Sequence, residues 1–239
     1  MYKNYVFDFY GTLVDIRTDE EKKEIWETLS LFYGYYGAVY TSEEMKEKYK
    51  KLTECRTEVL YSHEAYPEIQ LETVFQELFA AKGVAADDNL TLHAGQFFRA
   101  LTTEYIRLYE GVPEMLERIK RKGKKVYLLT NAQRIFTEYE LCMLGIKNFF
   151  DGILISSDYG MKKPDKRFFR ILLERYHLNP KECIMIGNDS STDIAGAVSV
   201  GMDTCYIHSN ISPEIDEKVN ATYVQPILNI EKLCSIIGI

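Results

Sequence analysis

IMIGNDSSTDIAGAVSVGM, residues 184–202, is the stretch that indicates the fold most clearly. It opens with an apolar run that is typical of a buried strand, and the run stops at a polar turn. The residues from Thr192 onward predict a helix, which Gly201 would close. A buried strand that leads through a polar turn into a helix is half of a parallel βαβ unit.

The same alternation of strand and helix extends from this stretch in both directions. Strands alternating with helices of about 10–15 residues imply right-handed crossovers and a parallel sheet covered on both faces. The sequence therefore predicts an α/β fold. The predicted strands cover residues 5–7, 125–131, 150–157, 204–209 and 221–226, and the predicted helices cover residues 113–123, 135–145, 165–177 and 231–237.

Between the first strand and residue 101 the pattern is different. Apolar residues recur three and four positions apart, which predicts amphipathic helices, and no segment there reads as a convincing strand. We therefore expect an α/β core of residues 1–16 and 102–239, interrupted by an all-helical domain of residues 17–101. The predicted helices of that region cover residues 20–36, 42–63, 71–83 and 90–109.

Composition and charge exclude several classes of protein. The 239 residues carry a formal net charge of −7 with no long basic run, which argues against a dedicated nucleic-acid surface. No window approaches the ~18 consecutive apolar residues of a membrane span, and the N-terminus lacks the layout of a secretion signal. The five cysteines never form a CxxC pair, which indicates reduced thiols. We expect a cytoplasmic protein with neither a membrane nor a nucleic-acid partner.

Polar side chains gather where the predicted parallel strands end, which is where open α/β sheets bind ligands. An aspartate there can attack an electrophile, and a lysine can neutralise the charge that develops. An acidic cluster can hold a hard cation such as Mg²⁺. This combination suits covalent catalysis on an electrophile that bears negative charge. The residues concerned are Asp8, Tyr10, Thr130, Asn131, Lys163, Asn188, Asp189 and Asp193.

Four segments of the chain resemble, in order, the motifs of the haloacid dehalogenase-like (HAD) hydrolases. They are FDFYGTLVD (7–15), VYLLTNAQ (126–133), MKKPDKRFF (161–169) and the stretch 184–202. The resemblance covers the whole chain. It implies a Rossmann-like parallel-sheet core and, in the helical insert, a cap domain that chooses the substrate.

The resemblance also implies roles for individual residues, with Asp8 as the nucleophile. The substrate would be a small, anionic, phosphorylated metabolite, and the protein a monomer or a homodimer. The implied catalytic residues are Asp8, Tyr10, Lys163 and Asp193; the residues that bind the substrate are Gly11, Thr130, Asn131 and Lys163; the ligands of Mg²⁺ are Asp8, the Tyr10 carbonyl, Asn188 and Asp189.

Each of these positions also has a purely structural interpretation. Asp8 could cap a turn, and Thr130 with Asn131 could form the N-terminal cap of the next helix. Lys163 could be a solvated loop residue, and residues 189–193 could do no more than open the helix that follows them. The functional interpretation is favoured because the four segments occur together and in order.

Two residues depart from the pattern of the phosphatases in this family. Tyr10 stands where they carry an aspartate that serves as general acid and base, and a phenol with an ordinary pKa near ~10 is a poor proton donor at neutral pH. Asn188 stands where they carry an aspartate, so one negative charge is missing beside the metal. The 2-haloacid dehalogenases, which need no metal, resemble this chain in having a tyrosine at the first position and an asparagine near the second.

Three functions therefore remain open at the level of sequence: a magnesium-dependent phosphatase, a metal-independent hydrolase of the 2-haloacid dehalogenase type, and a weakly active binding protein. Neither Arg17 nor Arg56 falls where the halide-binding arginine of a dehalogenase is expected. The pair Asp193–Ile194 and the pair Gly196–Ala197 are typical of the magnesium-dependent members. The sequence thus favours the phosphatase.

Overall fold

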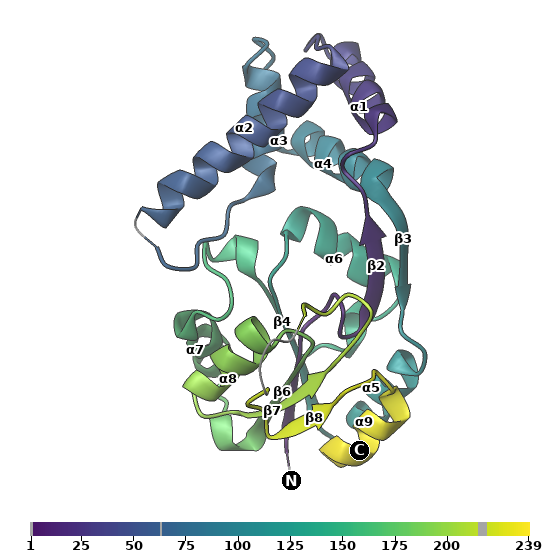
Figure 1. Ribbon diagram of the computed structural model, residues 1–239, viewed down its shortest axis with the longest axis vertical. Coiled ribbons are helices and arrows are strands. Elements are labelled where there is room, and N and C mark those ends of the chain that lie inside the picture. Colours follow the sequence, from purple (N-terminus) through teal and green to yellow (C-terminus); the bar gives the residue numbers. More distant parts are fainter. Residues whose placement is uncertain (1, 63, 215–218) are drawn as a thin grey trace.

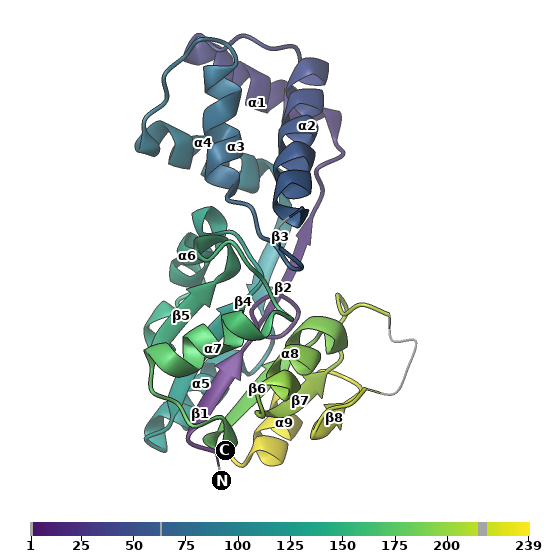
Figure 2. The ribbon, with the colours of Figure 1, turned by 90° about the vertical axis from the view of Figure 1, so that its left-hand side faces the viewer.

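The computed structural model describes residues 2–62, 64–214 and 219–239. A sheet surrounded by helices forms one part of the molecule, and a bundle of helices lies beyond it, joined to it by a ribbon of two strands (Figure 1). Both termini lie at the end of the sheet-containing part that is remote from the bundle (Figure 2).

β1 lies in the interior of the main sheet, which has six strands within the described residues, in the order β5-β4-β1-β6-β7-β8. It pairs in parallel with β4 on one side and with β6 on the other, so the chain order reverses at β1. At such a point the connections diverge and leave a crevice beyond the carboxyl ends of the strands. The strands are β1 (Asn4–Phe7), β4 (Lys125–Thr130), β5 (Gly152–Ile155), β6 (Cys183–Gly187), β7 (Asp203–Ile207) and β8 (Tyr223–Gln225).

Alternate residues of β1 face opposite sides of the sheet, and each side has its own core. Tyr5 and Phe7 pack in the cluster that α5 and α9 cover, whereas Val6 packs with α7 and α8. The sheet is therefore covered on both faces, as a parallel sheet requires. The helices are α5 (Val112–Arg121), α6 (Arg134–Met143), α7 (Lys166–Arg175), α8 (Ala195–Ser199) and α9 (Ile230–Ile237).

The helical bundle has an aromatic core of its own. Tyr33 and Phe79 stack with ring centroids 4.0 Å apart, and Trp26 packs against Phe98. The same cluster includes Phe136 of α6, so the bundle rests on this helix of the α/β part. The bundle contains α1 (Lys23–Tyr35), α2 (Ser42–Tyr61), α3 (Leu71–Ala80) and α4 (Asp88–Thr102).

The two-stranded ribbon corrects the prediction of a single helix over residues 90–109. The helix α4 ends at Thr102, and residues Thr103–Leu108 form β3, which pairs antiparallel with β2 (Val14–Thr18). Arg107 donates to the buried carboxylate of Asp15 across the ribbon, at 2.7 Å. Asp15 and Arg107 are 92 positions apart in sequence, so the periodicity of a single segment could not predict that they pair.

The predicted α/β fold with a parallel sheet is confirmed. In the stretch 184–202, residues Ser190–Ile194 form a π-helical turn before α8, so the predicted helix is interrupted at its start. The predicted helix over 42–63 ends at Tyr61, and residue 63 lies outside the described residues. Within the part of the chain that the structure describes, no helix is long and apolar enough to cross a membrane.

Candidate active site

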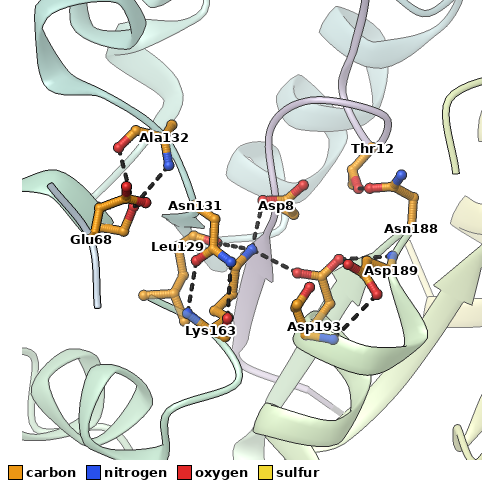
Figure 3. A network of polar contacts seen from close by, with 12 residues as sticks. Asp8, Thr12, Glu68, Leu129, Asn131, Ala132, Lys163, Asn188, Asp189 and Asp193 are labelled. Atoms are coloured by element: carbon orange, nitrogen blue, oxygen red, sulfur yellow. Dashed lines mark hydrogen bonds and ion pairs between the residues drawn. The ribbon is translucent and has the colours of Figure 1, made fainter. Parts of the chain in front are cut away.

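The side chain of Lys163 lies at the centre of a buried polar cluster at the carboxyl end of β1 (Figure 3). Its Nζ donates to Asp8 Oδ1 at 2.6 Å, to Asp193 Oδ1 at 2.6 Å and to the Leu129 carbonyl oxygen at 2.8 Å. These acceptors engage every proton of the ammonium group. The side chains of Lys163 and Asp193 are each 1% exposed and that of Asp8 is 12% exposed, so Asp8 is the member that a substrate can reach.

Separate segments of the chain supply this cluster. Asp8 follows the last residue of β1, Asp193 lies in the π-helical turn after β6, and Lys163 lies between β5 and α7. Asn131, which follows β4, fixes the backbone of Lys163. Its Oδ1 accepts from the Lys163 N–H at 2.8 Å, and its Nδ2 donates to the Lys163 carbonyl at 3.0 Å. In this arrangement Asn131 positions Lys163.

The charges of the cluster stabilise one another. Burial alone would lower the pKa of Lys163, but the charges of Asp193 and Asp8 outweigh burial and raise that pKa. Burial also raises the pKa of Asp193, and the charge of Lys163 opposes this rise. Lys163 is therefore a fixed positive charge at neutral pH. It is suited to neutralising negative charge on a bound group, not to transferring a proton.

The hydroxyl of Thr130 is buried and finds no hydrogen-bond partner among the described residues. Thr130 is the last residue of β4, the strand next to β1, so it shares the sheet edge of Asp8. A buried polar group without a partner costs about 1–3 kcal/mol. A ligand oxygen bound at this edge would remove that cost, which makes Thr130 a suitable donor to an oxyanion.

Asn188 lies against the turn that follows Asp8. Gly11 in that turn has a φ of +79°, and a Cβ on it would lie 2.3 Å from Asn188 Nδ2, so a glycine is required for this approach. Thr12 Oγ1 donates to Asn188 Oδ1 at 3.3 Å, and Asn188 Nδ2 donates to Ser212 Oγ at 3.3 Å. Gly11 therefore shapes the turn, and Asn188 is seated beside it.

Asp189 serves as the N-terminal cap of the π-helical turn. Its Oδ1 accepts from the Ser191 N–H at 2.8 Å, from Ser191 Oγ at 2.7 Å and from the Thr192 N–H at 3.3 Å. These bonds are the capping interpretation that the sequence left open. Among the described residues these bonds use Oδ1 alone, so Asp189, which the resemblance implied as a ligand of Mg²⁺, can cap the turn and still offer Oδ2 to a cation.

The hydroxyl of Tyr10 takes part in a cluster on α6. It donates to Glu140 Oε2, lies 3.1 Å from Thr137 Oγ1 and accepts from Arg99 Nη2 at 3.2 Å. Burial and the charge of Glu140 raise the pKa of this phenol above its ordinary value. The hydroxyl of Tyr10, which the resemblance implied as catalytic, is thus held by side chains of α4 and α6.

The donors beside Asp8 fit a hard cation. Asp8, the backbone carbonyl of Tyr10 and the side chain of Asn188 all offer oxygen atoms, which Mg²⁺ prefers. Among the described residues, no group of three or more His, Cys, Asp or Glu side chains is arranged to hold a metal ion. A cation at this place would therefore depend on carbonyl and amide oxygens beside the carboxylate of Asp8.

A loop of the helical bundle, residues 64–70, lies against the rim of the site. Glu68 accepts from Ser156 Oγ at 2.9 Å and from Gln133 Nε2 at 3.1 Å. The backbone carbonyl of Tyr66 accepts from the N–H of Lys162, the neighbour of Lys163, at 3.0 Å. Sequence reasoning missed Glu68, because its loop has no periodic pattern. Gln133 belongs to the second motif and could have been found there.

A cleft of about 530 Å³ lies between α2 and this loop. It is large enough for a small metabolite. Its lining contains charged side chains from the bundle, such as Lys50 and Glu54, together with Tyr49 of α2 and both Glu68 and Gln133 at the rim of the site.

Comparison with known proteins identifies a family and relatives. The family model of the haloacid dehalogenase-like hydrolases matches residues 2–201. The HAD-hydrolase YfnB of Bacillus subtilis is 26% identical over 242 residues, which is 98% of each chain. Glyceraldehyde 3-phosphate phosphatase of Methanothermobacter thermautotrophicus is 29% identical over 170 residues, which is 70% of each chain.

Solved structures share the fold. The crystal structure of 2-haloacid dehalogenase from Pseudomonas syringae superposes with a TM-score of 0.66 and 20% identity, covering 100% of this chain and 99% of that one. At this level of identity the likeness concerns the fold alone, which occurs with more than one chemistry.

Proposed function

The chain belongs to the haloacid dehalogenase-like hydrolases, and on that premise we propose that it is a magnesium-dependent phosphatase that acts through a covalent intermediate at Asp8. The observation that carries the proposal is the buried contact of Lys163 with Asp8 and Asp193, next to the unpartnered hydroxyl of Thr130. A reachable carboxylate, a fixed positive charge and a free hydrogen-bond donor at one sheet edge suit the attack of an aspartate on a phosphate ester.

In the proposed reaction, a carboxylate oxygen of Asp8 attacks phosphorus, and the bond to the leaving oxygen breaks. Lys163 neutralises charge on the phosphoryl oxygens, and the Thr130 hydroxyl donates to one of them. Water then attacks the phosphorus of the aspartyl-phosphate, which releases inorganic phosphate and regenerates the carboxylate. Asn131 contributes by holding the backbone of Lys163.

Asp8, the carbonyl of Tyr10 and Asn188 would hold Mg²⁺, which supplies additional positive charge beside the phosphoryl group. Asn188 contributes a neutral oxygen here, so the bound cation would keep more of its positive charge than it would beside a further carboxylate. Thr12, which donates to the Asn188 oxygen in the structure, would share that oxygen with the cation.

The leaving group of the substrate follows from the position of Tyr10. A general acid must reach the leaving oxygen, and the Tyr10 hydroxyl is bonded to Glu140, Thr137 and Arg99 instead. We therefore expect a small phosphorylated metabolite whose leaving group needs little protonation, such as an acyl or aryl phosphate. In the cytoplasm, as a monomer or a homodimer, such an enzyme would meet metabolites of this size.

For the dehalogenase alternative, neither of the two arginines considered in the sequence lies in the cluster around Lys163. Arg17 pairs with Glu104 on the ribbon, and Arg56 pairs with Glu77 within the bundle. These contacts engage both guanidinium groups with partners outside the cluster around Lys163, and Arg99, which contacts Tyr10 of the first motif, is paired with Glu140. The arrangement favours phosphoryl transfer.

Two substrates test the proposal directly. We expect turnover of p-nitrophenyl phosphate that EDTA abolishes and Mg²⁺ restores. Release of halide from 2-chloropropionate, unaffected by EDTA, together with no phosphate release, would instead establish the dehalogenase. Asp8→Asn should abolish this turnover. The control is Asp203→Asn, the same change at the amino end of β7, where the strands begin, and it should leave turnover within about twofold of the wild type.

A further inference from the structure

Tyr10, Arg99 and Glu140 form a closed set of polar contacts between three parts of the chain. Tyr10 lies in the turn after β1, Arg99 lies on the bundle helix α4, and Glu140 lies on α6 of the core. Arg99 Nε donates to Glu140 Oε1 at 2.7 Å and Arg99 Nη2 donates to the Tyr10 hydroxyl at 3.2 Å. Tyr10 in turn donates to the second oxygen of Glu140. We call these three residues the latch.

The latch is buried, whereas the ion pair of Arg118 with Glu231 lies on the surface. The side chain of Arg99 is 19% exposed and that of Glu140 is 9% exposed, whereas that of Arg118, which pairs with Glu231, is 39% exposed. The guanidinium of Arg99 also lies over the ring of Phe136, 5.1 Å from its centroid. Separation of Arg99 from Glu140 would leave a buried charge without compensation, which is energetically costly. The three side chains therefore hold one another in place.

The turn that carries Tyr10 is short and tightly bonded. The backbone N–H groups of Thr12, Leu13 and Val14 all donate to the carbonyl oxygen of Phe9. Tyr10 stands two positions beyond Asp8 in the same turn. A displacement of the Tyr10 ring is therefore transmitted to the backbone on which Asp8 stands, because the turn has little freedom to absorb it.

We propose that Arg99 and Glu140 are positioning residues for the nucleophile: through Tyr10 they fix the turn of Asp8 to the cap helix α4, so that the reaction geometry depends on the seating of the cap. This inference deepens the proposed function, since phosphatase turnover is one of its readouts. The chemistry at Asp8 needs placement to a fraction of an ångström, and a shift of about 1 Å can cost about 100-fold in rate.

The test compares Arg99→Ala with Arg118→Ala, a matched change in an ion pair on the far side of the core. We expect Arg99→Ala to lower kcat on p-nitrophenyl phosphate by about tenfold or more, measured well below the melting temperature, with KM changed less. Added guanidinium ions should restore part of the loss by occupying the vacated place. Arg118→Ala should stay within about twofold of the wild type.

A second variant separates positioning from stability. Tyr10→Phe keeps the ring but removes the hydroxyl, so its loss of kcat and that of Arg99→Ala should be non-additive in the double variant, because both break the same latch. A lowered melting temperature with kcat unchanged and no response to guanidinium would show that the latch only stabilises the fold, and would overturn the proposal.

Hydrogen exchange supplies a readout that does not require catalysis. If the latch fixes the turn, Arg99→Ala should increase amide exchange at residues 12–14, whose N–H groups close the turn, whereas Arg118→Ala should not. If the wild type hydrolyses no phosphate, the proposed function fails, while faster exchange in Arg99→Ala would still support the latch. Unchanged exchange in Arg99→Ala would contradict it. Should Arg99→Ala fail to fold, amide exchange at residues 12–14 is measured in Arg99→Lys instead, with the same two outcomes.

Discussion

The cluster around Lys163 and the helical bundle are held together by different means. The cluster consists of short polar side chains at strand ends, bonded at 2.6–2.8 Å and fixed by a parallel sheet. The bundle is held by aromatic packing, such as the stacked pair Tyr33 and Phe79, and its charged pairs lie mainly on the surface. The first arrangement tolerates little change, whereas the second can vary its surface without loss of its core.

The difference teaches where chemistry and selectivity reside. The groups that we propose react with a phosphate belong to the α/β part, whereas the cleft that reaches Glu68 and Gln133 takes most of its lining from α2 and the neighbouring loop of the bundle. We infer that substitutions in the cluster lower turnover for every substrate, while substitutions among the bundle residues that line the cleft change which substrate is accepted. The predictions below test that separation, beginning with the largest effect.

Replacement of the nucleophile should give the largest effect. Asp8→Asn keeps the shape of the side chain and removes its charge, so we expect kcat to fall by at least about 1,000-fold for every phosphate substrate. Circular dichroism should show a folded protein. Retained turnover on even one substrate would break the separation between the cluster and the bundle.

Removal of the lysine should reduce both stability and turnover. Lys163→Met leaves Asp8 and Asp193 as buried carboxylates without their partner, which should cost about 3–5 kcal/mol in the free energy of unfolding, measured in urea. In the double variant Lys163→Met, Asp193→Asn, one of the two charges is gone, so part of the stability should return. Turnover should stay absent, and its recovery would show that Lys163 is only structural.

Thr130 should affect turnover without a cost in stability. Thr130→Val removes a hydroxyl that has no partner in the free protein, so we expect an equal or higher free energy of unfolding and a fall of about 10–100-fold in kcat/KM. Thr204→Val is the matched control, because the Thr204 hydroxyl accepts from the Thr222 N–H at 3.1 Å. It should lose about 1 kcal/mol of stability and retain turnover. A loss of stability in Thr130→Val with unchanged kcat/KM would show that Thr130 does not bind the substrate.

The smallest effect concerns the loop of the bundle and pH. Burial raises the pKa of Glu68, so the folded chain binds its proton more strongly than the unfolded chain does. The contribution of Glu68 to stability is therefore complete below the unfolded pKa and is lost as the pH rises through the folded pKa. Relative to the wild type, the melting temperature of Glu68→Gln should rise by about 2 °C between pH 4 and pH 7. A relative fall would contradict the sign of the shift.

The parallel sheet and its strand-end residues could be predicted from sequence because their signals are local. An apolar run that stops at Asp8 or at Thr130 reports both the strand and the residue at its end. The contacts of Tyr10 could not be predicted in this way. They depend on Arg99, 89 positions away, and on Glu140, 130 positions away, and no pattern within one segment links such positions.

The helical bundle shows the same limit in a different form. Its amphipathic helices were evident from their periodicity, but the end of the last one was not, since residues 103–108 continue with apolar residues that also suit a strand. In the folded chain, residues 103–108 form a strand because they pair with residues 14–18. Asp189 is a related case: a cap and a metal ligand require the same residue type, and only the hydrogen bonds of the folded chain show that Oδ1 of Asp189 serves as the cap.

The central claim is that Asp8 becomes covalently bonded to the phosphoryl group. During turnover of p-nitrophenyl phosphate, samples quenched in acid and reduced with borohydride should contain homoserine at position 8, which mass spectrometry of the digested chain identifies. Asp8→Asn should yield none. Rapid turnover with an unmodified aspartate at position 8, or with the reduced residue at another carboxylate, would contradict the account.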